Sequence, residues 1–197
     1  MNDGWLDRWI MGHDAPVWGG GLLQLALILL LLFWIVGAHN RLMRLRSALG
    51  PAWLQIDELL LRRSAALDML VAAVRETLTE EAGSLQALTV AQDAQRLAAL
   101  AVRPRPHSAE LLQAWLAAER AMVSPLARLH ALVEQHPELD ASEGVRPARQ
   151  LLAELAPRLI YARQAYSQPA EAYNAALQEF PTRLLTTLFG FKPAAPL

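Results

Sequence analysis

The histidines and carboxylates of this 197-residue chain do not have the spacing of a known catalytic or metal-binding motif. None of the five histidines belongs to an HExxH zinc pair. Glu134 and His136 are two residues apart, so on a helix they point to different faces. The glycine run at residues 19–21 lacks the lysine of a nucleotide-binding loop, and no GxSxG sequence occurs. We therefore predict no catalytic residue, no metal site and no cofactor, and we expect the protein not to be an enzyme.

Two adjacent carboxylates, Asp57 and Glu58, also argue against acid–base chemistry. Neighbouring side chains on a helix diverge, whereas paired acid–base catalysis needs side chains that converge. Glu58 precedes Arg62 by four residues, which is the spacing of an ion pair on a helix surface. The pattern favours a solvated, salt-bridged helix face.

Three arginines, Arg41, Arg44 and Arg46, follow the most apolar stretch of the chain. Arginines next to a membrane attract anionic lipid headgroups, at about 1 kcal/mol each near the surface. The same charges set the orientation of a membrane helix. We take the three residues as candidate headgroup contacts, and a role in topology alone stays open beside this interpretation.

The composition excludes several classes of protein. The absence of cysteine excludes disulfides, cysteine nucleophiles, zinc ribbons and iron–sulfur clusters. A formal net charge of −1 argues against a general nucleic-acid-binding protein. Hydrophobic residues make up 54% of the chain, and many of them are concentrated in one segment.

That segment is residues 19–38, GGGLLQLALILLLLFWIVGA, in which Gln24 is the one polar side chain. At about 1.5 Å per residue, such a helix crosses the roughly 30 Å hydrocarbon core of a bilayer. A cleaved signal peptide is the alternative, since Gly37 and Ala38 are small. Signal peptides, however, begin with positive charge and have a shorter apolar stretch, whereas residues 1–18 hold three aspartates and one arginine. We predict an uncleaved transmembrane helix.

Positive charge lies on the C-terminal side of this helix, because one arginine precedes it and three follow within eight residues. The positive-inside rule then makes residues 1–18 a short extracytoplasmic segment and places the rest of the chain in the cytoplasm. Tryptophans in residues 1–18 fit a segment at the membrane interface, and a disordered tail is an equal alternative. Richness in alanine and arginine is typical of a GC-rich bacterial genome, so we expect a single-pass protein of the bacterial inner membrane.

The rest of the chain has the pattern of helices. No run rich in valine, isoleucine and threonine alternates with a period of two, and good helix formers dominate. Apolar residues recur at helical steps in two stripes, first at Trp53, Ile56, Leu60, Leu67, Leu70, Val74 and Leu78, then at Leu111, Trp115, Leu116, Met122, Leu126 and Leu129. Such faces must be buried on one another. The predicted fold class is all-α, with the membrane helix followed by a long antiparallel bundle of three to four helices over residues 39–183.

Glycine, proline and serine mark the predicted helix ends. Gly50-Pro51 should kink or interrupt the first long helix. Pro104 and Pro106 should end the next, and Ser108 is a typical N-cap for the one after. The last helix is predicted over residues 147–178, kinked by its internal prolines, with an apolar tail over residues 184–197. These prolines also make a sustained coiled coil the less favoured arrangement.

Several stretches together resemble the LemA family, in the same order along the chain. Residues 39–46 (HNRLMRLR), 52–57 (AWLQID) and 61–63 (LRR) are similar to the family's YNxLVxLRN, AWSQID and LKRR, and residues 134–141 (EQHPELDA) to its ExYPxLKA. The ending resembles its RxxYN…YN…FP…LFGF pattern at Arg163, Tyr166, Tyr173, Asn174, Phe180, Pro181 and residues 188–191. His39 and Leu54 depart from the usual Tyr and Ser, Ser167 replaces an Asn, and residues 82–105 are weakly similar.

The resemblance implies architecture more than activity. Proteins of this family have an N-terminal membrane helix and a domain of long antiparallel helices, and no catalytic residue is established for them. The motif residues are therefore candidates for structure or interaction: Trp53, Gln55, Asp57, Arg63, Arg163, Tyr166, Tyr173, Asn174, Phe180 and Pro181.

The residue types divide these candidates into two groups. Trp53 and Phe180 suit a core, whereas the polar members need partners if buried, at a cost of roughly 1–3 kcal/mol for each unpaired group. We expect Asp57 or Gln55 to bond Arg163 or a tyrosine hydroxyl between the first and last helices. The alternative is that these side chains face water and pair locally.

Three functions are compatible with these features. The first is a membrane-anchored interaction or scaffold protein with a protein partner that the sequence does not identify. The second is an enzyme or a regulator of a membrane protease or sensor, and the third is a lipid-binding or membrane-shaping module. We favour the first, with membrane lipid as a further partner and with neither nucleic acid nor a small-molecule substrate, because the sequence holds no converging polar site.

Overall fold

The computed structural model describes residues 17–197, and every element in this range is a helix. The predicted all-α class is thereby confirmed. Residues 1–16, which hold most of the predicted extracytoplasmic segment, lie outside the described residues. The elements in chain order are α1 (Val17–Ser47), α2 (Leu49–Val74), the 3-10 helix η1 (Thr79–Glu81), α3 (Ala82–Val102), α4 (Ala109–Gln135), the 3-10 helix η2 (Pro137–Ala141), α5 (Val145–Gln178) and α6 (Thr182–Phe189).

The chain divides into two compact units, residues 1–41 and 42–197. In the described part of the first unit, a helical stretch beginning at Gly21 is long and apolar enough to cross a membrane. Its large side chains face outward, and Leu22, Leu30 and Phe33 are each at least two-thirds exposed. An isolated soluble helix gains nothing from such exposure, so this stretch is a candidate membrane helix.

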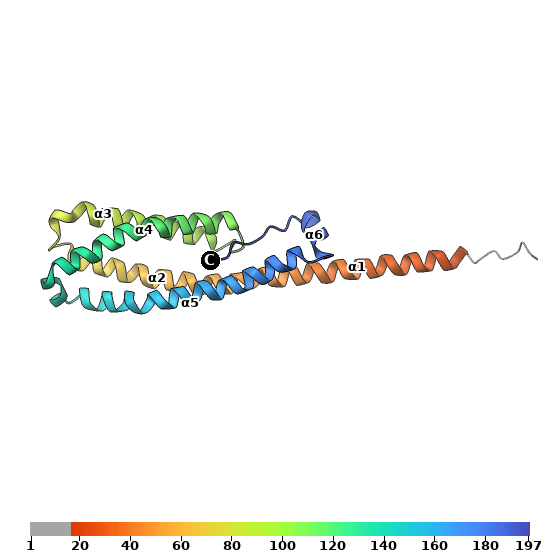
Figure 1. Cartoon of the computed structure of the whole chain (residues 1–197), viewed down its shortest axis with the longest axis horizontal. Helices are drawn as coiled ribbons and strands as arrows, with labels where there is room; N and C mark the ends of the chain where they lie inside the picture. The colour runs from red at the N-terminus through yellow and green to blue at the C-terminus, as the bar shows by residue number, and fades with distance from the viewer. Residues whose placement is uncertain (1–16) are drawn as a thin grey trace, which may run out of the picture. The chain divides into compact units, whose positions relative to one another are not determined.

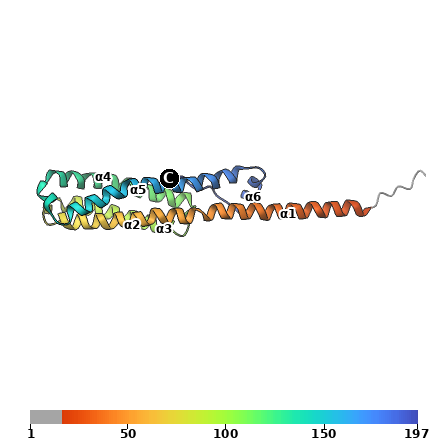
Figure 2. The ribbon, with the colours of Figure 1, turned by 90° about the horizontal axis from the view of Figure 1, so that it is seen from below.

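The second unit is an antiparallel bundle of α2, α3, α4 and α5. Helix α2 packs closely along α5, and α3 packs closely along α4 (Figures 1 and 2). Ion pairs fix the direction of neighbouring helices: Arg103 near the end of α3 bonds Asp57 in the first half of α2, and Arg128 late in α4 bonds Glu81 just before α3. The predicted antiparallel bundle is therefore present, with four helices.

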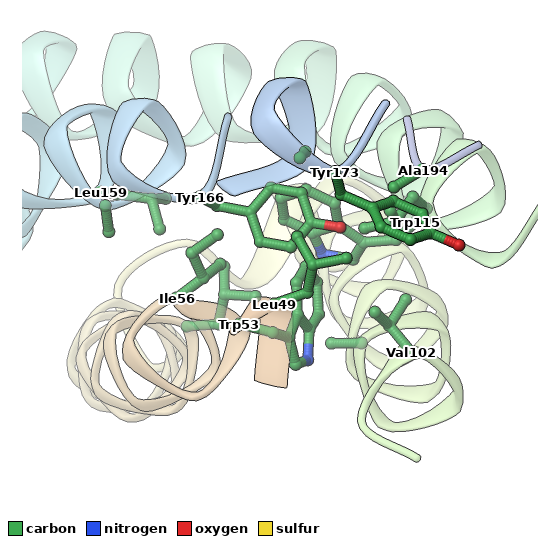
Figure 3. Packing of buried hydrophobic residues seen from close by; sticks show 14 of the residues in the cluster. Leu49, Trp53, Ile56, Val102, Trp115, Leu159, Tyr166, Tyr173 and Ala194 are labelled. Atoms are coloured by element: carbon green, nitrogen blue, oxygen red, sulfur yellow. The ribbon is translucent and has the colours of Figure 1, made fainter. Parts of the chain in front are cut away.

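Large aromatic side chains fill the space between the two helix pairs. The rings of Trp53 on α2 and Trp115 on α4 meet edge to face, with centroids 5.1 Å apart, and Tyr166 on α5 packs on Trp53 at 6.4 Å (Figure 3). All three side chains are fully buried. Burial of one large apolar side chain is worth about 1.5–3 kcal/mol, so this cluster is a main source of bundle stability.

The first predicted apolar stripe is confirmed residue by residue, because all seven of its members are buried. In the second stripe Trp115, Met122 and Leu129 are buried, and Leu112 replaces Leu111 as the innermost residue of the first turn. The prediction that Phe180 belongs to the core is wrong, since 84% of its surface is exposed. It follows α5 at the turn into α6, where no helix packs over it.

The predicted helix ends are largely observed. Helix α1 ends at Ser47, whose carbonyl would otherwise bond the missing N–H of Pro51. The Ser108 hydroxyl caps α4 by accepting the Leu111 N–H over 3.4 Å. Helix α5 starts two residues before the predicted position and continues through Pro157 and Pro169. The break after Val74 was not predicted, since Leu78 continues the stripe and is buried although it lies outside α2.

Candidate functional site

A carboxylate of α4 lies between two arginines from other helices. Arg63 of α2 donates to both oxygens of Glu119, one of these bonds being 3.1 Å long. Arg163 of α5 donates to Oε2 of Glu119 over 2.6 Å, and its guanidinium carbon lies 5.0 Å from the Trp115 ring centroid. The Glu119 side chain is 11% exposed. This Arg63–Glu119–Arg163 triad ties α2, α4 and α5 together beside the aromatic cluster.

A pocket of about 490 Å³ adjoins the triad. Its walls are mostly apolar and come from α4 and α5, with the triad at one end, and its lining includes Leu126, Leu152, Ala156 and Ile160. The two arginines of the triad share one carboxylate, so the excess of positive charge at this end is partly compensated within the protein. We assign the triad a structural role.

Asp57 forms a second interhelical contact. It is buried, and its Oδ2 accepts from Nε and Nη2 of Arg103, the C-cap residue of α3, at 3.1 and 2.5 Å. The expected bond from Asp57 or Gln55 to Arg163 or a tyrosine hydroxyl is therefore wrong. The physical reason is the direction of each side chain: Asp57 faces α3 rather than α5, and Gln55, two residues from Trp53, lies on the exposed face of α2.

The two motif tyrosines bond to backbone instead. Both rings are buried, the Tyr166 hydroxyl donates to the Pro106 carbonyl over 2.5 Å, and the Tyr173 hydroxyl donates to the Lys192 carbonyl over 3.1 Å. Burial raises the pKa of both phenols above the ordinary value, which keeps them protonated as donors. Tyr166 thereby holds the α3–α4 loop against α5.

The segment after α6 is attached to α5 by paired hydrogen bonds. The Asn174 side chain donates to the Ala194 carbonyl at 2.7 Å and accepts the Ala194 N–H at 2.9 Å. Ser167 makes the same two-way contact with Leu197, at 2.8 and 3.0 Å. Residues 191–197, part of the predicted apolar tail, are therefore docked on the bundle. Pro181, by contrast, is the N-cap residue of α6, and its carbonyl accepts the Leu184 N–H over 3.1 Å.

A basic pocket of about 480 Å³ lies where three segments of the second unit meet. Arg46 comes from the end of α1, Arg105 and His107 from the α3–α4 loop, and Lys192 from the segment after α6. Nη2 of Arg46 lies 2.5 Å from Nε2 of His107. Burial, and then the charges of Arg46 and Arg105, lower the pKa of His107.

Of the three predicted headgroup contacts, Arg46 alone lines this pocket. Arg44 is exposed at the end of α1, and Arg41 belongs to the first unit, where it is also exposed. Their contact with lipid stays a prediction. Among residues 17–197, no group of three His, Asp or Glu side chains is placed to hold a metal ion.

Two residues of these contacts, Glu119 and Arg103, were not predicted from the sequence. Glu119 follows Trp115 by four residues and precedes Met122 by three, so it lies on the apolar stripe of α4. A carboxylate on such a stripe indicates a buried charge that needs a partner, and this signal could have found it. Arg103 carries no comparable signal, because it sits at the end of α3 beside the loop.

The comparisons with known proteins agree with this architecture. The model of the LemA family matches residues 52–197. Two curated relatives from Paramagnetospirillum magneticum, magnetosome proteins MamQ 1 and MamQ 2, are each 30% identical to the chain over 82 residues. These matches cover 42% of this chain and 30% of each relative.

Proposed function

This chain belongs to the LemA family, and from that premise we propose that it is a non-enzymatic scaffold protein anchored in the bacterial cytoplasmic membrane. The span at residues 19–38 holds the bundle at the membrane, and the bundle binds a protein partner in the cytoplasm. The magnetosome relatives match over less than a third of their own length, so no magnetosome role is transferred to this chain.

The charge distribution supports the proposed orientation. Three arginines lie within eight residues of the end of the span, and one precedes it. Arginines in short flanking segments stay on the cytoplasmic side. The bundle then lies in a reducing compartment, which fits a chain without cysteine.

One apolar surface of the bundle carries the proposal of a protein partner. Leu61 on α2 and Leu100 on α3 line one shallow pocket although each is about half exposed. Leu97, one turn from Leu100, is 68% exposed, and Leu54, two turns from Leu61, is 53% exposed. We call these four residues the α2–α3 apolar face. Exposed apolar residues gathered on a soluble domain mark interaction sites.

Ion pairs lie on both sides of Leu61 along α2. Asp57 bonds Arg103 between Leu54 and Leu61, and Asp68 bonds Arg96 over 2.5 Å on the other side of Leu61. An apolar centre with a polar rim is the usual anatomy of a protein interface. The occupant that fits is an apolar helix of another protein, because a helix ridge packs into the shallow groove between two helices.

The test is site-specific photocrosslinking in intact cells. A photoreactive residue replaces Leu61 or Leu97 in the full chain, and the matched control replaces Gln113, which is exposed on α4. We expect both leucine positions to crosslink the same protein. The control position should not crosslink that protein, and any other crosslink from it should be weaker. Adding Leu100→Glu should abolish the crosslink from position 61. Equal crosslinking from all three positions, or from none, would contradict the proposal.

A further inference from the structure

The basic pocket holds an excess of positive charge that no group among residues 17–197 compensates. Arg105 and Lys192 form no ion pair within this range, and Arg46 bonds only the imidazole of His107. Glu110 is the one carboxylate in the lining. Three cations and one carboxylate give a formal charge of +2 in a pocket of about 480 Å³, which is an arrangement complementary to an anion.

His107 holds Arg46 in place without adding charge. Arginine can only donate, so Nε2 of His107 must accept the bond from Arg46, which requires a neutral imidazole. Burial and the two nearby guanidinium groups lower the pKa of His107 below its ordinary value, in agreement with that neutral form. The Arg46 guanidinium therefore keeps its remaining N–H groups for another acceptor.

Lys192 is positioned by the backbone on which it lies. Its carbonyl accepts the Tyr173 hydroxyl, and two residues later Ala194 is held by Asn174 through two bonds. The chain reaches this place by reversing at Gly190, which has a φ of +67° and ends α6 in the left-handed conformation. The backbone of Lys192 is thus held at the pocket, which its exposed side chain helps to line.

The N-terminus of α4 adds to the same field. Ser108 and Ala109, at the start of this 27-residue helix, line the pocket. The first turn of a long helix carries a partial positive charge and favours anions. Guanidinium, ammonium and a helix N-terminus together form the donor set with which proteins bind phosphate.

We infer that this pocket binds the phosphate group of an anionic phospholipid at the cytoplasmic membrane surface. The inference rests on the membrane anchor of the proposed function. Arg46 follows the end of the predicted span by eight residues, which reach at most about 29 Å even when fully extended. The pocket is therefore tethered close to the headgroup layer, and a lipid phosphate is present there at high local concentration.

The test is lipid binding to the detergent-solubilised full chain, followed by native mass spectrometry. Phosphatidylglycerol is titrated against the wild type, against Arg105→Gln/Lys192→Gln, and against the matched control Arg120→Gln/Arg158→Gln. The control removes the same number of positive charges as the pocket variant. Arg120 and Arg158 are exposed, form no ion pair among the described residues and lie outside the pocket. All four side chains are exposed, so circular dichroism should show an unchanged fold.

We expect the pocket variant to bind phosphatidylglycerol about 30-fold more weakly than the wild type, from the loss of two headgroup contacts. The control variant should stay close to the wild type, and zwitterionic phosphatidylcholine should bind all three proteins weakly. Equal affinity of the two variants, or equal binding of the two lipids, would overturn the inference. Binding of glycerol phosphate to the wild type without any binding of phosphatidylglycerol would assign the pocket to a soluble phosphate and would also overturn the inference.

A separate experiment distinguishes a failure of this inference from a failure of the proposed function. Alkaline carbonate extraction of membranes from cells that produce the wild type tests the anchor. Release of the chain by carbonate would contradict the anchor on which both proposals depend. Retention, together with an absent preference for phosphatidylglycerol, would overturn the lipid site alone and leave the proposed anchor and protein partner standing.

Discussion

Arg163 on α5 donates to Glu119 on α4 over 2.6 Å while its guanidinium group covers the face of Trp115. The carboxylate would be costly to bury alone, and Arg63 of α2 donates to the same carboxylate. One acidic residue on the apolar stripe of α4 thus fixes the relative register of three helices.

Replacement of Glu119 by Gln should destabilise the bundle strongly. The change keeps the shape of the side chain but leaves Arg63 and Arg163 without a counter-charge, both largely buried. Because the arginines keep some contact with water, we expect a loss of about 2–3 kcal/mol in the free energy of unfolding. Urea unfolding of the detergent-solubilised protein, followed by circular dichroism, measures it.

A compensating variant checks the cause. Glu119→Leu combined with Arg63→Met and Arg163→Met removes all three charges and keeps apolar volume over Trp115. Replacing a buried ionic triad by apolar residues is often neutral or stabilising, so the triple variant should be more stable than Glu119→Gln. A triple variant that is less stable would show that the triad contributes through its bonds rather than through charge compensation.

The Asp57–Arg103 pair should respond unequally to the loss of each partner. The Asp57 side chain is 7% exposed and that of Arg103 is 46% exposed. Arg103→Gln leaves a buried carboxylate without its cation, and we expect it to cost about 2 kcal/mol. Asp57→Asn frees Arg103 into water and should cost about 1 kcal/mol. Comparison of the two unfolding midpoints tests this order, and equal or reversed costs would contradict the assigned burial.

Two aromatic motif residues should differ sharply in their effect on stability. Trp53 is fully buried between Trp115 and Tyr166, so Trp53→Ala should cost about 3–5 kcal/mol. Phe180 is exposed, and Phe180→Ala should change stability by no more than about 0.5 kcal/mol. Thermal melting of both variants provides the measurement. A large loss for Phe180→Ala would mean that this side chain is covered in the membrane-bound protein.

His107 should make the bundle sensitive to acid. Its pKa in the folded protein is lowered, so near the ordinary value of 6.5 the unfolded chain binds more protons than the folded one. The stability contributed by neutral His107 is therefore present above about pH 6.5 and lost as the pH falls through the folded pKa. The melting temperature of wild type should fall more steeply on acidification than that of His107→Gln. Parallel pH profiles would contradict the prediction.

The sequence predicted the faces of the helices well. Apolar spacing alone identified the seven inward residues of the first stripe, because only one side of an amphipathic helix can enter a core. The proline pair at Pro104 and Pro106 and the cap at Ser108 also marked the α3–α4 loop. These features depend on local chemistry, which a single sequence contains.

The partners across the bundle could not be predicted in the same way. Periodicity showed that Asp57 and Arg163 lie near apolar stripes but not which helix each one faces. The facing helix depends on the order and register of all four helices. In the structure Asp57 pairs with Arg103, and Arg163 pairs with Glu119. Phe180 was misassigned for a related reason, since its type suits a core but its position after α5 lies outside the helix stripes.

The proposed function requires the bundle to lie on the cytoplasmic face of the membrane, and labelling of single cysteines tests this most directly. Because the chain has no cysteine, Gly4→Cys and Gln113→Cys each introduce one reactive thiol in the full protein. A membrane-impermeant maleimide is added to spheroplasts before and after permeabilisation. We predict that Gly4→Cys is labelled in intact spheroplasts and Gln113→Cys only after permeabilisation. Labelling of Gln113→Cys in intact spheroplasts would contradict the account.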